Sequence, residues 1–209
     1  MHAYRCFSNL FTYESIDMKK IILGSASPRR KELLKMLGLS FEVKPKDVDE
    51  SFSDEIKGKD VALYLAKKKL SAFKDELRGD ELIITADTIV CLGGKILGKP
   101  QNAKDAKSML TSLSGKAHSV VTACGLMSKE KTDVFYEETK VVFRAISNLE
   151  IEYYITNYQP YDKAGAYAIQ EWIGMAAIQR IDGCYYNVVG LPLSKLYMYL
   201  KPYIKLDNT

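Results

Sequence analysis

The run LIITADTIVCL, residues 82–92, restricts the possible folds more than any other stretch of this sequence. Apart from one aspartate, it consists of apolar residues and threonine, which is typical of a strand buried on both faces. Such a strand belongs to a sheet that helices cover, and strand-like and helix-like segments alternate along the chain. We expect strands at 19–24, 41–45, 81–92, 117–128, 133–145, 173–181 and 187–189, and helices at 28–37, 59–77, 102–113, 147–157 and 192–200. The sequence therefore predicts an α/β fold, with a mixed, elongated sheet flanked by helices and two lobes around a cleft.

Asp87 lies in the middle of this apolar run. A buried carboxylate without a partner is costly, so it needs a metal ion, a cationic partner or a raised pKa, and all three occur at reactive centres. The alternative is an aspartate in a turn at the end of the strand.

The segment SASPRR, residues 25–30, lies at the junction between the first expected strand and the first expected helix. Ser27 suits the N-cap and Pro28 the first helical position. The free amides of a helix N-terminus favour an anion, and the Ser25 hydroxyl and the forked guanidinium groups of Arg29 and Arg30 add donors for phosphate or carboxylate. The alternative is a well-capped surface helix with solvated arginines.

Lys69 falls near the centre of an apolar helical stripe that includes Leu65 and Leu70. It either extends to water or reaches an anion across the cleft. Lys99, in the stretch GKP, and Lys163, in YDKAGAYAIQ, are by pattern alone solvated surface charges. The acidic stretch KDVDESF, residues 46–52, is a solvated loop unless one carboxylate faces the buried aspartate and helps to hold a metal.

Composition argues against several classes of protein. A formal net charge of +4 indicates neither nucleic-acid nor membrane binding. The two histidines make a histidine-based triad or metal site improbable, and the four cysteines lack zinc-ligand spacing, which fits a reducing, cytoplasmic setting. No apolar run is long enough to span a membrane.

Residues 1–18 do not have the pattern of a signal peptide, and we expect them to be a dispensable extension. Residues 19–206 are then a single domain with two lobes. We expect many of the dispersed tyrosines to serve the core or the interface of a homodimer.

With these residues described, the chain resembles the Maf family of nucleoside triphosphate pyrophosphatases. The resemblance extends from about residue 19 to 203 and rests on motifs in family order: SASPRRKELL, DVDE, LAKKK, TADTIV, LGKP, LSGKAHSVVTA, DKAGAYAIQ and VVGLPL. It implies an α/β fold with a deep nucleotide-binding cleft and a divalent cation, Mg²⁺ or Mn²⁺. It also implies hydrolysis of a nucleotide to its monophosphate and pyrophosphate.

The resemblance also assigns roles to residues. Asp87 matches the proton acceptor. Three positions that separate subfamilies are matched by Arg29, Thr88 and Gln170. These residue types are those of the branch that acts on dTTP and UTP. Other cleft positions are matched by Ser25, Arg30, Glu50, Lys69, Lys99 and Lys163. One departure is Glu171, where a glycine commonly follows the glutamine.

The resulting hypothesis is a pyrophosphatase with a nucleoside triphosphate substrate. The loop of Ser25 to Ser27 grips the triphosphate, the cations at 30, 69, 99 and 163 neutralise it, and Asp87 with Glu50 holds the metal. Two alternatives remain open: a nucleotide-binding regulator of cell division with little turnover, and a house-cleaning pyrophosphatase for modified nucleotides.

Overall fold

The structure, a computed structural model, describes residues 19–204, so the extension expected at residues 1–18 lies outside the described part. One seven-stranded mixed sheet runs through the molecule in the order β2-β1-β3-β5-β6-β7, and β4 pairs with β3. Its strands are β1 (Lys20–Leu23), β2 (Phe41–Val43), β3 (Glu81–Leu92), β4 (Lys95–Leu97), β5 (Ala117–Met127), β6 (Thr132–Phe143) and β7 (Ile178–Asp182). β1 is parallel to β2 and β3, whereas the other pairs are antiparallel. The prediction of a mixed α/β fold is confirmed.

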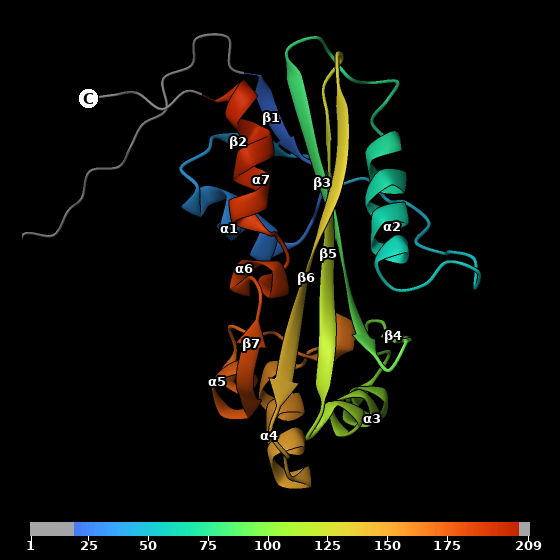
Figure 1. The fold of residues 1–209 in the computed structure, drawn as a ribbon, viewed down its shortest axis with the longest axis vertical. Coiled ribbons are helices and arrows are strands. Elements are labelled where there is room, and N and C mark those ends of the chain that lie inside the picture. Colours follow the sequence, from blue (N-terminus) through green and yellow to red (C-terminus); the bar gives the residue numbers. More distant parts are fainter. Residues whose placement is uncertain (1–18, 205–209) are drawn as a thin grey trace, which may run out of the picture.

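Helices cover the sheet along its whole length (Figure 1). They are α1 (Pro28–Met36), α2 (Lys59–Ser71), α3 (Ala103–Leu113), α4 (Asn148–Tyr158), α5 (Trp172–Ala177), α6 (Tyr185–Val189) and α7 (Leu193–Leu200), with 3₁₀ turns η1 (Ala164–Ala166) and η2 (Lys201–Tyr203). The long strands β3, β5 and β6 run from the end with α1, α2 and α7 to the end with α3, α4 and α5 (Figure 1). None of the described helices is long and apolar enough to cross a membrane.

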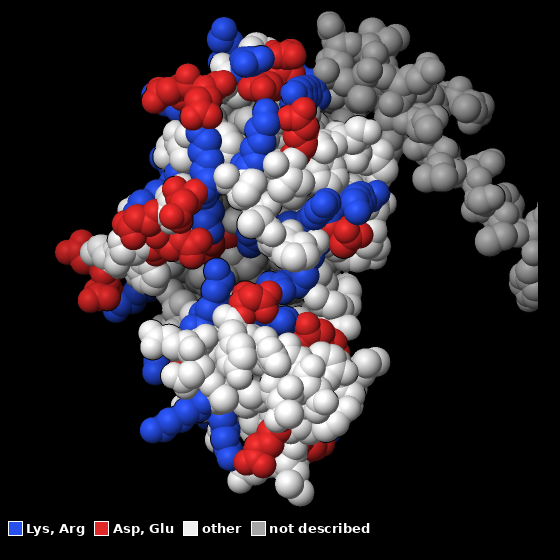
Figure 2. Space-filling model, turned by 180° about the vertical axis from the view of Figure 1, so that it is seen from behind, with Lys and Arg blue, Asp and Glu red and all other residues white. Residues whose placement is uncertain are grey.

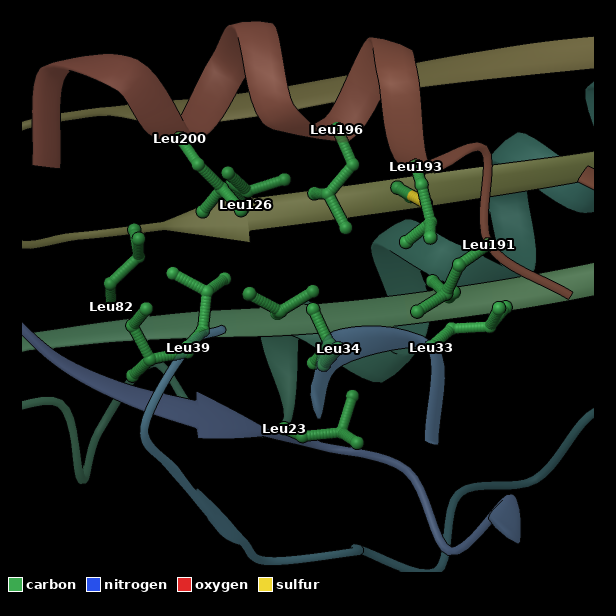
Figure 3. Packing of buried hydrophobic residues seen from close by; sticks show 14 of the residues in the cluster. Leu23, Leu33, Leu34, Leu39, Leu82, Leu126, Leu191, Leu193, Leu196 and Leu200 are labelled. Carbon is green, nitrogen blue, oxygen red and sulfur yellow. The ribbon is translucent and has the colours of Figure 1, made fainter. Parts of the chain in front are cut away.

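The two ends have separate apolar cores. At the first end, leucines of α1 and α7 pack over β1, β3 and β5, as Figure 3 shows for Leu34, Leu196 and Leu200. At the other end, α3, α4 and the residues around η1 pack over the far halves of β3, β5 and β6, and this core contains Phe143, Tyr154 and Tyr167. The middle of β3, which carries Asp87, lies between them.

Three sequence predictions of secondary structure were wrong. The strand expected at 173–181 is correct only from Ile178, where β7 begins, whereas residues up to Ala177 are helix α5. In this helix Gly174 packs so tightly that a Cβ would come within 1.7 Å of the Ile169 carbonyl oxygen. The strand expected at 187–189 is helix α6, whose buried Asn187 donates to Val120 O and Thr139 Oγ1. These tertiary contacts override local β-propensity.

The helix expected at 59–77 ends at Ser71. Phe73 N–H donates to Leu70 O at 3.0 Å, which tightens the chain into turns. This brings the Phe73 ring against Gly24, where a Cβ would lie 2.8 Å from it. Burial of the ring, which is 4% exposed, outweighs continued helix.

Candidate active site

A cleft of about 620 Å³ lies between the two ends of the molecule. All eleven residues that the sequence singled out line it: Ser25, Ser27, Arg29, Arg30, Glu50, Lys69, Asp87, Thr88, Lys99, Lys163 and Gln170. Figure 2 shows positive and negative side chains mixed around a hollow at mid-height. The fold therefore gathers residues from six separate sequence motifs around one space.

The floor of the cleft is an ion-paired cluster on β3 and α2. Asp87, 7% exposed, pairs in the ladder with Ala123 and is therefore within the strand, not in a turn at its end. Lys69 Nζ donates to Asp87 Oδ1 at 2.5 Å and lies 2.7 Å from Glu50 Oε1. The buried aspartate has a cationic partner, and the stripe lysine reaches anions instead of extending to water.

Glu50 comes from the acidic loop and joins this cluster across the cleft floor. Burial raises the pKa of Glu50, but the hydrogen bond and charge of Lys69, with the charges of Lys99 and Arg30, outweigh it and hold the pKa below its usual range. Glu50 is therefore ionised at neutral pH. Asp49, in contrast, turns outward and pairs with Lys68.

Helix α1 forms one wall of the cleft, and its N-terminus has the cap that the sequence predicts. Ser27 Oγ accepts from Arg30 N at 3.4 Å, and Pro28 occupies the first turn. The Arg30 guanidinium donates to Ser25 Oγ at 3.1 Å, to Thr88 Oγ1 at 3.0 Å and to Gly190 O at 3.0 Å. Arg30 therefore joins the first helix, the central strand and the residue after α6.

Burial lowers the pKa of Arg30, and the negative charge of Asp87 opposes this effect. A guanidinium keeps its proton under such conditions, so the wall stays cationic. The residue behind it is Thr88, whose hydroxyl also bonds to Thr122 Oγ1 at 2.9 Å.

The opposite wall is the irregular segment 161–171. Arg29 of α1 reaches across the cleft to Asp162, with 2.8 Å between NH1 and Oδ2. Lys163, 7% exposed, lies 2.7 Å from Asp162 Oδ1 and 3.3 Å from Glu171 Oε1. Burial raises the pKa of Asp162, but Lys163 and Arg29 outweigh it and lower the pKa to about 2.

Lys99 and Gln170 line the cleft with exposed side chains. Within residues 19–204, neither side chain has a hydrogen-bond or ion-pair partner, so both are available to a ligand. Lys99 is placed next to this segment because Gly165 N–H donates to Gly98 O at 3.0 Å.

The cleft therefore combines two carboxylates on its floor with six lining cationic side chains: Arg29, Arg30, Lys46, Lys69, Lys99 and Lys163. In a comparison with known proteins, the family model described as Maf-like protein matches residues 20–203. The chain belongs to the Maf family.

Three curated relatives named dTTP/UTP pyrophosphatase are similar to this Maf protein along nearly their whole length. The protein from Phocaeicola vulgatus is 48% identical over 90% of this chain and 98% of its own. Those from Flavobacterium johnsoniae and Porphyromonas gingivalis are each 46% identical, over 90% and 91% of this chain and 96% and 97% of their own.

A divalent cation, which the Maf family implies, can be tested against the donors present. The described residues contain no group of three or more histidine, cysteine or acidic side chains that could form a complete metal site. Mg²⁺ typically binds through one or two carboxylates together with substrate phosphates, however, and Asp87 and Glu50 meet at one cation, Lys69. These two carboxylates fit a metal that shares its coordination with a nucleotide.

Two contributors to this Maf site were not predicted as such. The Gly190 carbonyl orients Arg30, and Gly190 itself has a φ of +134°, a conformation that favours glycine. Asn187 fixes α6 behind the cleft through Val120 and Thr139. The motif VVGLPL contains Gly190 but says nothing about its contacts, and Asn187 lies just before this motif.

Proposed function

We propose that this protein hydrolyses dTTP and UTP to the nucleoside monophosphate and pyrophosphate. The observation that carries the proposal is the pairing of Asp87 and Glu50 with Lys69 on the floor of a cleft lined by five further cations. The names of the 46–48% identical relatives support the same activity and the same two substrates.

Triphosphate binding follows from the positive charge on both walls. The N-terminus of α1 and the hydroxyl of Ser25 supply donors on one side, and Lys99 and Lys163 supply charge on the other. Arg30 holds the first wall in place and adds its own charge. Because phosphoryl transfer is mostly positioning and charge neutralisation, such a cleft accounts for much of the catalysis.

The reaction adds water to the α-phosphorus and breaks its bond to the oxygen that bridges to the β-phosphorus. Asp87 accepts a proton from the attacking water, and pyrophosphate leaves. Asp87 Oδ1 is taken by Lys69, whereas Oδ2 has no hydrogen-bond partner within residues 19–204 and can serve the water. When bound, a Mg²⁺ or Mn²⁺ ion held by Asp87 and Glu50 would acidify water and neutralise phosphate oxygens.

Base selection is assigned to Gln170, with Arg29 and Thr88 as the accompanying specificity residues. A uracil or thymine edge offers acceptor, donor, acceptor, and an amide donates to O4 while it accepts from N3–H. Cytosine reverses this pattern and should be disfavoured. Gln170→Glu tests the assignment: an unchanged preference among UTP, dTTP and CTP would exclude Gln170 from it.

The activity itself is tested by chromatographic analysis of products from dTTP, UTP, CTP, GTP and 7-methyl-GTP with Mg²⁺ or Mn²⁺. Monophosphate and pyrophosphate from dTTP and UTP alone are expected. Turnover of a modified or purine nucleotide instead would favour a house-cleaning role, and binding without turnover would favour a regulator.

We further propose a location in the cytoplasm, a single domain with two lobes, and a homodimer. Cys91, Cys124 and Cys184 are free, which supports a location in the reducing cytoplasm. The single domain with two lobes and the homodimer are supported only by the sequence.

A further inference from the structure

Gln170, the proposed base-selecting residue, is presented by a tight turn. Glu171 N–H donates to Ala168 O at 3.1 Å, so that Gln170 lies inside a turn closed by its neighbours. Its own side chain is exposed in the cleft. The position of its amide therefore depends on what holds the two ends of this turn.

One buried hydroxyl binds both ends. Tyr154 of α4 is fully buried, and its Oη accepts from Ala168 N–H at 3.2 Å. The same hydroxyl donates to Glu171 Oε2. Burial and the neighbouring carboxylate of Glu171 raise the pKa of Tyr154, so the hydroxyl keeps its proton and remains a donor.

Glu171 extends this connection to Lys163 at the other side of the segment. Its second oxygen, Oε1, lies 3.3 Å from Lys163 Nζ, which also lies 2.7 Å from Asp162 Oδ1. An ammonium group has three N–H donors, so two directions are used and one is left for a ligand in the cleft.

The turn has no room to move away from this hydroxyl. Gly174 of α5 lies directly against Ile169, since a Cβ there would come within 1.7 Å of Ile169 O. Tyr154 is in turn fixed by stacking on Tyr158, with 5.1 Å between ring centroids. The turn is therefore held from α4 on one side and α5 on the other.

We propose that Tyr154 and Glu171 are positioning residues for base selection: the Tyr154 hydroxyl and the Glu171 carboxylate fix the turn that presents Gln170, although neither residue is among those that line the cleft. This inference rests on the proposed function. It predicts that discrimination between UTP and CTP depends on a hydroxyl group in α4.

The test measures the ratio of kcat/KM for UTP to that for CTP in Tyr154→Phe and Glu171→Ala. We expect this ratio to fall on the order of tenfold in both, because small displacements of a positioned group have effects of that size or larger. Glu171→Gln keeps an acceptor for the tyrosine hydroxyl and should keep the ratio within about twofold of wild type.

Tyr158→Phe is the matched control. It removes a hydroxyl from the same helix, and this hydroxyl has no hydrogen bond within residues 19–204, so the ratio should not change. Cooperative urea unfolding of each variant shows that the measured enzyme is folded. The dissociation constants of UTP and CTP without metal give the same ratio independently of turnover.

An unchanged ratio in folded Tyr154→Phe and Glu171→Ala, by both measurements, would overturn the inference. A ratio that falls equally in Tyr158→Phe would also overturn it. If the wild-type protein releases no pyrophosphate from any nucleotide, the proposed function fails. The binding ratio then still decides whether the turn is positioned as described.

Discussion

Helix α1, one wall of the cleft, rests on an aliphatic core, whereas residues 161–171, the other wall, combine apolar packing with hydrogen bonds from buried polar side chains. Leu33 and Leu34 anchor α1 among the leucines of α7 and the first strands. On the other side, Tyr154 binds the turn around Gln170, and His118 Nε2 lies 2.7 Å from the hydroxyl of Tyr167. The comparison indicates that an irregular segment needs specific hydrogen bonds to its own backbone in addition to apolar packing, whereas a helix satisfies its backbone groups itself.

The largest effect on stability is expected in the aliphatic core. Leu196→Ala in α7, at a fully buried position, should lower the free energy of unfolding by about 3 kcal/mol through lost burial and a cavity. Urea unfolding measures this change. The UTP to CTP ratio should stay constant, since the residue acts on the α1 side.

Leu149→Ala is the control for this prediction, because Leu149 is 79% exposed and should change stability little. Equal losses in the two variants would mean that the core assignment is wrong.

Arg30→Lys should lower the free energy of unfolding by about 2–3 kcal/mol. Arg30 donates to three acceptors on three elements, and a single ammonium cannot reproduce this fork. Arg29→Lys should lower the free energy of unfolding by less than about 1 kcal/mol, because it alters one ion pair at the rim of the cleft. Thermal or urea unfolding separates the two, and a smaller loss for Arg30 than for Arg29 would contradict the account.

The wall formed by residues 161–171 should make the free energy of unfolding depend on pH, because His118 lies against its Tyr167. Burial lowers the pKa of His118 to about 4, against 6.5 for the unperturbed side chain. The unfolded chain therefore takes up a proton below pH 6.5, which the folded protein does not do until about pH 4. Stability should fall by about 2 kcal/mol from pH 7.5 to pH 5.

His118→Phe should reduce this pH dependence when urea unfolding is measured at both values. An equal pH dependence in wild type and variant would show that the histidine is not the group responsible. Because His118→Phe leaves the α1 side unchanged, a difference in pH dependence between wild type and variant is assigned to the wall formed by residues 161–171.

The smallest effect is expected at the cap of α1. Ser27→Ala should lower the free energy of unfolding by about 1 kcal/mol, because the backbone amide of Arg30 loses its hydrogen-bond acceptor. Ser27→Asp replaces the acceptor and should restore stability. If alanine and aspartate behave alike in urea unfolding, the cap does not stabilise this helix.

The same contrast explains what could be predicted from the sequence. Local signals predicted α1 correctly: Ser27 as its cap, Pro28 in its first turn and Gly38 soon after its end. The buried run of β3 likewise predicted its strand and the need of Asp87 for a partner. These features depend on residues adjacent in the chain.

Features that depend on distant contacts could not be predicted in this way. The partner of Asp87 is 18 residues away, and Arg30 bonds to Gly190 from 160 residues away. The helices α5 and α6 were expected as strands because their apolar residues fit both patterns, and only the contacts of Gly174 and Asn187 decide between them.

We propose that the ion-paired floor of the cleft, formed by Asp87, Glu50 and Lys69, carries out the chemistry. The most direct test is kcat for pyrophosphate release from UTP in Asp87→Asn, with Asp49→Asn as the control, since Asp49 pairs outward with Lys68. We predict a loss of about 100-fold or more for Asp87→Asn, as for a removed general base, and nearly normal turnover for Asp49→Asn. Near-normal turnover by folded Asp87→Asn would contradict the account.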